Sequence, residues 1–178
     1  MRPVLGLVAF GITALLVQSV AAVHLPAAWV PNLSLLVAVA LGLHLEAAGG
    51  LVVAGSLGYA SDLFSGSLLG QHALLRALAC AGTRLANRGL DLRRFLPLAV
   101  YAALLTLAEA AAVGGLTTLF AGRAALDRAL VAVLGQQMLV NALAAPLVSG
   151  AAGWVVRWTL PEESVRRSVR LEPRRPLV

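Results

Sequence analysis

The sequence predicts an all-α membrane protein: a bundle of about six transmembrane helices with both termini in the cytoplasm. Of the 178 residues, 60% are hydrophobic and only 12% are charged, whereas a soluble domain carries about a quarter charged residues. Apolar runs recur along the chain, and most are long enough to cross a bilayer or nearly so. A soluble fold would have to expose much of that surface to water. The arginines gather at particular ends of these runs, which fixes the orientation of the helices.

The first three apolar runs occupy residues 4–23, 33–45 and 51–64. Residues 4–23 resemble the opening of a signal peptide, but the run is long and leads straight into further apolar segments, so we interpret it as a retained helix. The link over residues 24–31 contains two prolines as helix breakers and Trp29 as an interfacial anchor. The second and third runs are short, since about 13 helical residues cover about 20 Å of a core about 30 Å thick. They could be tilted, be extended by flanking residues or form a re-entrant hairpin.

The remaining apolar runs occupy residues 69–85, 95–120 and 129–158, the last of which should end in the membrane interface. Residues 161–178 alternate acidic and basic side chains and have little apolar content, so they cannot bury a core. The sequence therefore predicts one transmembrane helical domain over residues 1–160, followed by a basic, disordered cytoplasmic tail.

Arginine placement predicts which way the chain threads the membrane. All fourteen basic residues are arginine, and with the N-terminus inside, eleven of them fall on the cytoplasmic side. These eleven are Arg2, Arg84, Arg88, Arg93, Arg94, Arg157, Arg166, Arg167, Arg170, Arg174 and Arg175. Arg123 and Arg128 fall outside, and Arg76 lies within a segment. The arginines therefore meet lipid headgroups, and the net charge of +6 does not indicate a nucleic-acid partner.

The sequence offers little for catalysis or cofactor binding. The single cysteine, Cys80, excludes an intrachain disulfide and a cysteine-cluster metal site, and the three histidines show no metal-ligand spacing. Ser56 lies in a Gly-Ser-Leu-Gly run that superficially resembles an intramembrane protease, but the usual motif and a later histidine at matching depth are missing. There is no phosphate loop, glycine fingerprint or zinc motif. We expect neither enzyme activity nor a cofactor or metal.

Ionisable side chains at membrane depth are the candidate functional residues, because each costs at least about 2.5 kcal/mol on insertion scales. Asp62 lies near the outer end of the third run and Arg76 near the outer part of the fourth, with a short turn between them. The two could form a bidentate ion pair that lowers the burial cost of both. Alternatively, Asp62 caps the turn while Arg76 extends outward to the interface. The sequence leaves both alternatives open.

Glu109 is the costliest of these residues because it lies roughly 16 Å from the outer end of the fifth run. Asn141 lies at about the same depth in the sixth run, which crosses in the opposite direction. We therefore expect Glu109 and Asn141 to face each other or a shared cavity.

A ridge of small residues follows the third run. Gly50, Ala54 and Gly58 are spaced at i, i+4 and i+8, and Asp62 completes the series. Small side chains let membrane helices approach closely. The ridge is a candidate for the bundle interior and is equally consistent with an interface to another membrane protein.

The residues around the third run also resemble a known family. The matching elements are Pro31-Asn32-Leu33, Gly58, Asp62-Leu63-Phe64-Ser65-Gly66, Leu69-Gly70 and Ala73-Leu74. At this spacing they resemble MreD, the membrane subunit of the bacterial rod-shape machinery or elongasome, over roughly residues 1–160. Asp62 with Ser65 and Gly66 carries most of the match. The chain departs from the pattern at Asn32, where an acidic residue is common, and at Ser61, where glutamine is frequent.

The resemblance implies a non-enzymatic scaffold in the bacterial cytoplasmic (inner) membrane. MreD-like proteins associate with MreC, and through it with MreB filaments and the peptidoglycan synthases that elongate the wall and maintain cell shape. Asp62, Arg76, Glu109, Asn141, Ser65 and Gly66 are then the expected partner- or cavity-lining residues. The family is also similar to the substrate-binding S components of energy-coupling-factor vitamin transporters, which implies a six-helix bundle with a cavity open to the outside.

Two functions therefore compete: a scaffold and a vitamin-binding S component. A binder needs convergent polar groups in a pocket, and the outer segments supply few of them, namely Asp62, Ser67, Gln71, His72 and Arg123. A scaffold needs only small-residue faces and lipid-facing seams, which are abundant. We favour the scaffold.

Overall fold

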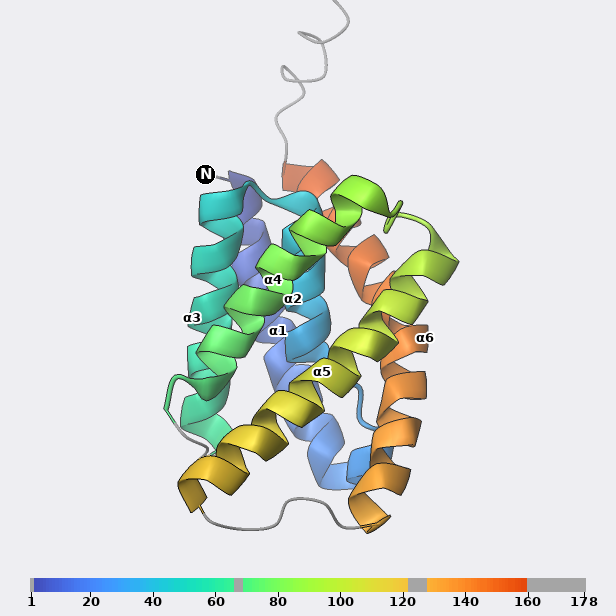
Figure 1. The fold of residues 1–178 in the computed structure, drawn as a ribbon. Coiled ribbons are helices and arrows are strands. Elements are labelled where there is room, and N and C mark those ends of the chain that lie inside the picture. The colour runs from blue at the N-terminus through green and yellow to red at the C-terminus, as the bar shows by residue number, and fades with distance from the viewer. Residues whose placement is uncertain (1, 66–68, 122–127, 160–178) are drawn as a thin grey trace, which may run out of the picture.

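The computed structural model describes residues 2–65, 69–121 and 128–159. Within these ranges the chain forms six α-helices and one short 3-10 helix, with no strand. In chain order they are α1 (Arg2–His24), η1 (Ala27–Trp29), α2 (Leu33–His44), α3 (Ala47–Ser65), α4 (Gln71–Gly89), α5 (Phe95–Ala121) and α6 (Arg128–Thr159). The helices run up and down in one bundle (Figure 1). The predicted all-α fold and the six helices are confirmed.

The shortest of the described α-helices, α2, lies at the centre of the bundle (Figure 1). Ten of its twelve residues are buried, because α1, α3, α4 and α6 all pack around it. A helix that is apolar on every side is stable only in such surroundings. Asn32 caps its start, since the side-chain Oδ1 accepts a hydrogen bond from the backbone N–H of Leu35 at 3.2 Å.

Five of the helical segments are long and apolar enough to cross a membrane, and α4 is not among them. The five are Pro3–His24, Ala27–His44, Ala47–Phe64, Phe95–Leu116 and Val133–Thr159. Helix α4 is amphipathic: Arg76, Ala79 and Thr83 are buried, whereas Leu74 and Leu78 are exposed. Its polar side packs on α2 and α3, so α4 completes the bundle by burying polar groups in protein rather than by being apolar all round.

The structure corrects the bounds of two helices, α3 and α4. Helix α2 is short, as expected, but α3 begins at Ala47 rather than at residue 51 and contains 19 residues. At that length it covers about 28 Å, which nearly matches the bilayer core. Helix α4 also extends to Gly89, beyond the expected end at residue 85. Polar and small residues at these helix ends, outside the apolar runs, explain why apolar content alone placed the boundaries too far inward.

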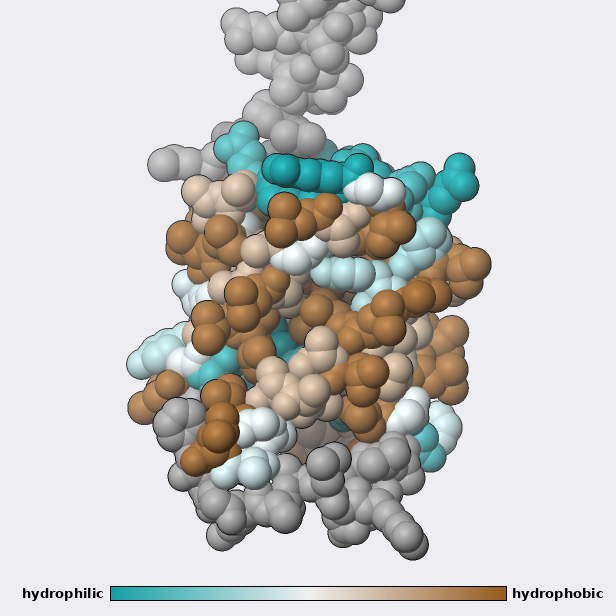
Figure 2. Space-filling model, viewed as in Figure 1, coloured by the Kyte–Doolittle hydropathy of each residue, from teal (hydrophilic) through white to brown (hydrophobic). Residues whose placement is uncertain are grey.

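The two ends of the bundle differ in polarity. The start of α1, the end of α6 and the α2–α3 and α4–α5 connections lie at one end (Figure 1), where hydrophilic residues gather (Figure 2). We call this end the basic face, because it holds the last turns of α4 and α6 with Arg88 and Arg157, and Arg93 and Arg94 between α4 and α5. Exposed apolar side chains such as Leu104 cover the flanks. The threading agrees with the arginine argument. Arg123 and the tail from residue 161 lie outside the described residues.

Candidate functional site

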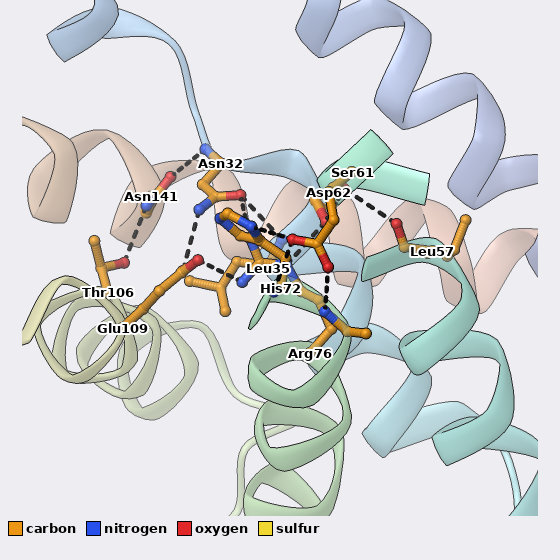
Figure 3. Close-up of polar contacts among 12 residues, drawn as sticks. Asn32, Leu35, Leu57, Ser61, Asp62, His72, Arg76, Thr106, Glu109 and Asn141 are labelled. Carbon is orange, nitrogen blue, oxygen red and sulfur yellow. Dashed lines mark hydrogen bonds and ion pairs between the residues drawn. The ribbon is translucent and has the colours of Figure 1, made fainter. Parts of the chain in front are cut away.

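Arg76 lies within a buried group of polar side chains (Figure 3), which includes Glu109 and Asn141 from the middle of α5 and α6. Only 2% of Arg76 is exposed, yet its guanidinium has three partners. Nη1 donates to Oε1 of Glu109 at 2.6 Å, Nη2 to Oδ1 of Asn32 at 3.2 Å, and Nε to the Ser34 hydroxyl at 2.9 Å. A buried ion pair offsets its desolvation only when the geometry is good and further hydrogen bonds complete it. Arg76 meets both conditions.

Asn32 connects four helices. Besides capping α2 and accepting from Arg76, its Nδ2 donates to Oε2 of Glu109 at 3.1 Å. Its backbone N–H donates to Oδ1 of Asn141 at 2.8 Å. The residue thereby links the start of α2 to α4, α5 and α6 through a single side chain and its own amide (Figure 3).

Asn141 closes the network on the side of α6. It is fully buried, and its Nδ2 donates to the Thr106 hydroxyl at 3.0 Å, which in turn donates to the carbonyl of Ala102 at 2.8 Å. Glu109 and Asn141 therefore face the same set of polar groups from α5 and α6, and both bind Asn32. We expected Glu109 and Asn141 to face each other or a shared cavity; the structure instead brings them together through Asn32. We call Asn32, Ser34, Arg76, Thr106, Glu109 and Asn141 the polar cluster.

Asp62 performs a different task at the start of α4. Its side chain is fully buried, and its carboxylate accepts backbone N–H groups from Gly70 at 3.0 Å, His72 at 3.0 Å and Ala73 at 3.3 Å. Nδ1 of His72 lies 2.8 Å from Oδ1. A carboxylate at this position satisfies the unpaired N–H groups of a helix start and favours the positive end of the helix dipole. Gly70 adopts a φ of +89°, which glycine adopts without strain.

The first alternative, an ion pair between Asp62 and Arg76, is wrong, and the second is met only for Asp62. Asp62 caps the start of α4, as the second alternative expected. Arg76 neither pairs with Asp62 nor extends outward to the interface: it turns into the bundle and pairs with Glu109. Of the other expected site residues, Ser65 ends α3 but its side chain is not described, and Gly66 lies outside the described residues.

The small-residue ridge packs against α4. A Cβ at Gly58 would overlap the backbone carbonyl of His72 and lie 2.7 Å from Cα of Ala73. A Cβ at Gly50 would lie 3.2 Å from Sγ of Cys80, and Ala54 between them is fully buried. The close approach of α3 and α4 is what brings Asp62 onto the start of α4.

Sequence reasoning missed the central role of Asn32. The signal was present, because an asparagine directly after Pro31 and directly before an apolar run is typical of a helix N-cap. Its contacts to Arg76, Glu109 and Asn141 could not be predicted, because those residues lie 44, 77 and 109 positions away.

A groove borders the polar cluster between α1 and α3. It has a volume of about 520 Å³. Its polar floor is made by Asn32, Ser34, Ser61, His72 and Arg76, and its walls include Ile12, Leu16, Leu57 and Phe64. The hydroxyl oxygens of Ser34 and Ser61 lie 3.2 Å apart across that floor. The arrangement offers hydrogen bonding at membrane depth beside apolar walls. Among the described residues, no three His, Cys, Asp or Glu side chains lie together as a metal site would need.

Comparison with known proteins gives one match. The sequence profile of the family described as rod shape-determining protein MreD matches residues 1–120. That range includes the whole polar cluster except Asn141, and it includes the α1–α3 groove. No curated protein and no solved structure shows a significant match.

Proposed function

The chain belongs to the family of rod shape-determining protein MreD, and from that premise we propose that it is a non-enzymatic membrane scaffold of the bacterial elongasome. Family membership gives it a role in rod-shape determination. In our proposal it sits in the bacterial cytoplasmic membrane with both termini inside and binds an MreC-like protein. Through that partner it acts on MreB filaments and on the synthases that elongate peptidoglycan.

The observation that carries the proposal is that the side chains of the polar cluster point into the bundle and bond to one another. Catalysis needs a nucleophile and a base aimed at a position that a substrate can occupy. Here both carboxylate oxygens of Glu109 are bonded to Arg76 and Asn32, and Asn141 is sealed between Asn32 and Thr106. These bonds fix the relative positions of four helices. A fixed bundle with apolar flanks suits a protein that presents a surface to partners.

The α1–α3 groove is the surface that we assign to the MreC-like partner. Its walls match a transmembrane segment of a partner, since Ile12, Leu16 and Phe64 are apolar. Its floor includes the hydroxyl of Ser61, which donates to the carbonyl of Leu57 and can accept a hydrogen bond from a polar side chain on that segment. Such interhelical hydrogen bonds help membrane helices to associate.

The groove also favours a second candidate, the S component of an energy-coupling-factor vitamin transporter. A volume of about 520 Å³ lies within the range of roughly 300 to 1,000 Å³ that is usual for small-molecule sites. Several polar groups also converge on its floor. The scaffold remains our choice because the family is defined by shape determination and because the charged groups beside the groove are already paired.

Purification of the tagged protein from mild detergent separates the two functions. We expect an MreC-like protein to be recovered, and depletion of the protein in its native cell to give rounded cells. Recovery of an ATPase module together with a bound vitamin would overturn the scaffold proposal in favour of the S component.

A matched pair of variants tests the groove itself. Ile12→Trp fills the groove from α1, whereas Leu104→Trp adds the same bulk to an exposed position on α5. We expect the first to lower recovery of the MreC-like partner and the second to leave it unchanged, at equal levels of both variants in the membrane. Equal recovery with both variants would remove the groove as the docking surface.

A further inference from the structure

A second cavity opens at the basic face, far from the polar cluster. It has a volume of about 320 Å³ and lies between the end of α2, the α4–α5 connection, the start of α5 and the last turns of α6. Arg93 and Arg157 line it together with His44. We propose that this cavity, the basic pocket, binds the phosphodiester headgroup of an anionic phospholipid such as phosphatidylglycerol.

The first support is that two cations without a carboxylate partner among the described residues converge on one cavity. Arg93 comes from the α4–α5 connection and Arg157 from the last turn of α6, and both line the cavity together with His44. In the part of the chain that the structure describes, no carboxylate lies within 4 Å of either guanidinium, although Arg94 next door pairs with Asp91 at 3.2 Å. Two like charges at one cavity repel each other, so an anion between them removes an unfavourable interaction as well as adding a favourable one.

The second support is that specific contacts between α2 and α6 hold one wall of the basic pocket in place. Nε2–H of His44 donates to the carbonyl of Ser149 at 3.2 Å, which joins the end of α2 to α6. The imidazole ring rests on Gly153, where a Cβ would lie only 3.1 Å from Cε1 of His44. The absence of a side chain at Gly153 therefore lets the ring form one wall of the pocket, while the two arginines form the mouth.

The third support is the depth of the pocket in the membrane. Trp154 and Trp158 lie on the same turns of α6, are 53% and 74% exposed, and have ring centroids 5.2 Å apart. Exposed tryptophans of membrane proteins prefer the headgroup level. Phe95, at the start of α5, lines the pocket and is also exposed. A ligand here therefore meets cations and apolar side chains at once, which suits a headgroup with acyl chains better than a free phosphate ion.

The two positive charges of the pocket predict which phospholipid headgroup it prefers. A guanidinium presents a planar fork of donors that matches phosphate oxygens, and basic pockets between helices on the cytoplasmic side bind anionic headgroups. Phosphatidylethanolamine carries the same phosphate but adds an ammonium group, which Arg93 and Arg157 repel. The pocket should therefore select phosphatidylglycerol over phosphatidylethanolamine, and not merely bind any phospholipid.

Native mass spectrometry of the full-length protein, titrated with each lipid in detergent, tests this selectivity. We expect phosphatidylglycerol to be retained in preference to phosphatidylethanolamine. The double variant Arg93→Gln/Arg157→Gln should weaken phosphatidylglycerol binding at least about tenfold. The variant Arg93→Lys/Arg157→Lys, which keeps both charges but loses the planar fork of donors, should bind phosphatidylglycerol more weakly than the unaltered protein and more tightly than the double Gln variant. Equal retention of the two lipids by the unaltered protein would overturn the proposal.

A matched control separates a built site from general surface charge. Arg88→Gln/Arg94→Gln removes the same charge from the same face, but neither residue lines the pocket. We expect this control to keep phosphatidylglycerol binding. An equal loss in both double variants would mean non-specific attraction, and displacement of the lipid by millimolar inorganic phosphate would mean a free-anion site; either result contradicts the proposal. A second readout, the rise in thermal unfolding temperature on adding phosphatidylglycerol, should disappear only in the pocket variant.

Discussion

The polar cluster and the basic pocket both use arginine, but under opposite conditions. Arg76 is 2% exposed and has protein partners for Nε, Nη1 and Nη2. Arg93 and Arg157 are exposed and, among the described residues, have no carboxylate within ion-pairing distance. The same side chain therefore joins helices inside the bundle and is available to a ligand at the basic face. Burial and partners, rather than residue type, decide which role an arginine has.

The largest loss of stability is expected when the buried charge of Arg76 loses its carboxylate partner. Glu109→Ala leaves the guanidinium without its carboxylate and should cost about 3 to 5 kcal/mol of unfolding free energy, because an uncompensated charge stays buried. Denaturant unfolding in mixed micelles measures this loss. The double variant Arg76→Met/Glu109→Leu should recover much of it, since the desolvation cost disappears with both charges. If Glu109→Ala costs no more than Arg93→Gln does, the contrast between the two regions is wrong.

The same contrast explains how far the sequence could predict the site. Depth follows from counting 1.5 Å per residue, so Glu109 and Asn141 could be matched, and the ridge of Gly50, Ala54 and Gly58 could be recognised as a packing surface. Depth says nothing about helix rotation. The short turn in the chain suggested Asp62 as the ionic partner of Arg76, and nothing local pointed to Glu109.

Packing decided between those carboxylates. The carboxylate of Asp62 already accepts three backbone N–H groups at the start of α4, so Arg76 binds Glu109. The helix count and the threading direction needed only apolar runs and arginine placement, both of which are local. The polar cluster needed the mutual arrangement of α2, α4, α5 and α6, and that arrangement has no local signature.

A smaller loss of stability is expected at Asn32, where an added charge tests whether its side chain and that of Glu109 act together. Asn32→Asp replaces the donor Nδ2, 3.1 Å from Oε2 of Glu109, by an oxygen that repels it. We expect a loss of about 2 kcal/mol, the scale of an unsatisfied buried polar group. Adding Glu109→Gln should restore stability, because the pair again carries one carboxylate and one amide beside Arg76. A double-mutant cycle from denaturant unfolding measures this coupling. Additive losses would show that the two side chains do not act together.

Removing the charge of Asp62 at the start of α4 should lower the unfolding free energy less than the substitutions at Glu109 or Asn32. Asp62→Asn keeps one acceptor but removes the negative charge at the start of α4, so we expect a loss of about 1 to 2 kcal/mol. Hydrogen exchange of the amides of His72 and Ala73 should locate the change at the first turn of α4. The matched control is Asp91→Asn, whose exposed partner Arg94 lies at 3.2 Å. An equal loss in both variants would mean that the buried cap contributes no more than an exposed ion pair.

The smallest effect on stability is expected at Arg93 in the basic pocket, where the effect on lipid binding is largest. Arg93→Gln should change the unfolding free energy by less than about 0.5 kcal/mol, because an exposed charge without a carboxylate partner in the described structure contributes little. The same substitution should nonetheless weaken phosphatidylglycerol binding, since half of the cationic mouth of the basic pocket is lost. Unfolding in zwitterionic detergent and lipid titration by native mass spectrometry measure the two quantities separately. In the polar cluster the opposite holds. The guanidinium of Arg76 is buried among its protein partners, so its loss lowers the unfolding free energy. A stability loss at Arg93 as large as that at Glu109 would mean that the basic face is held together by its arginines and that they are not free for a lipid.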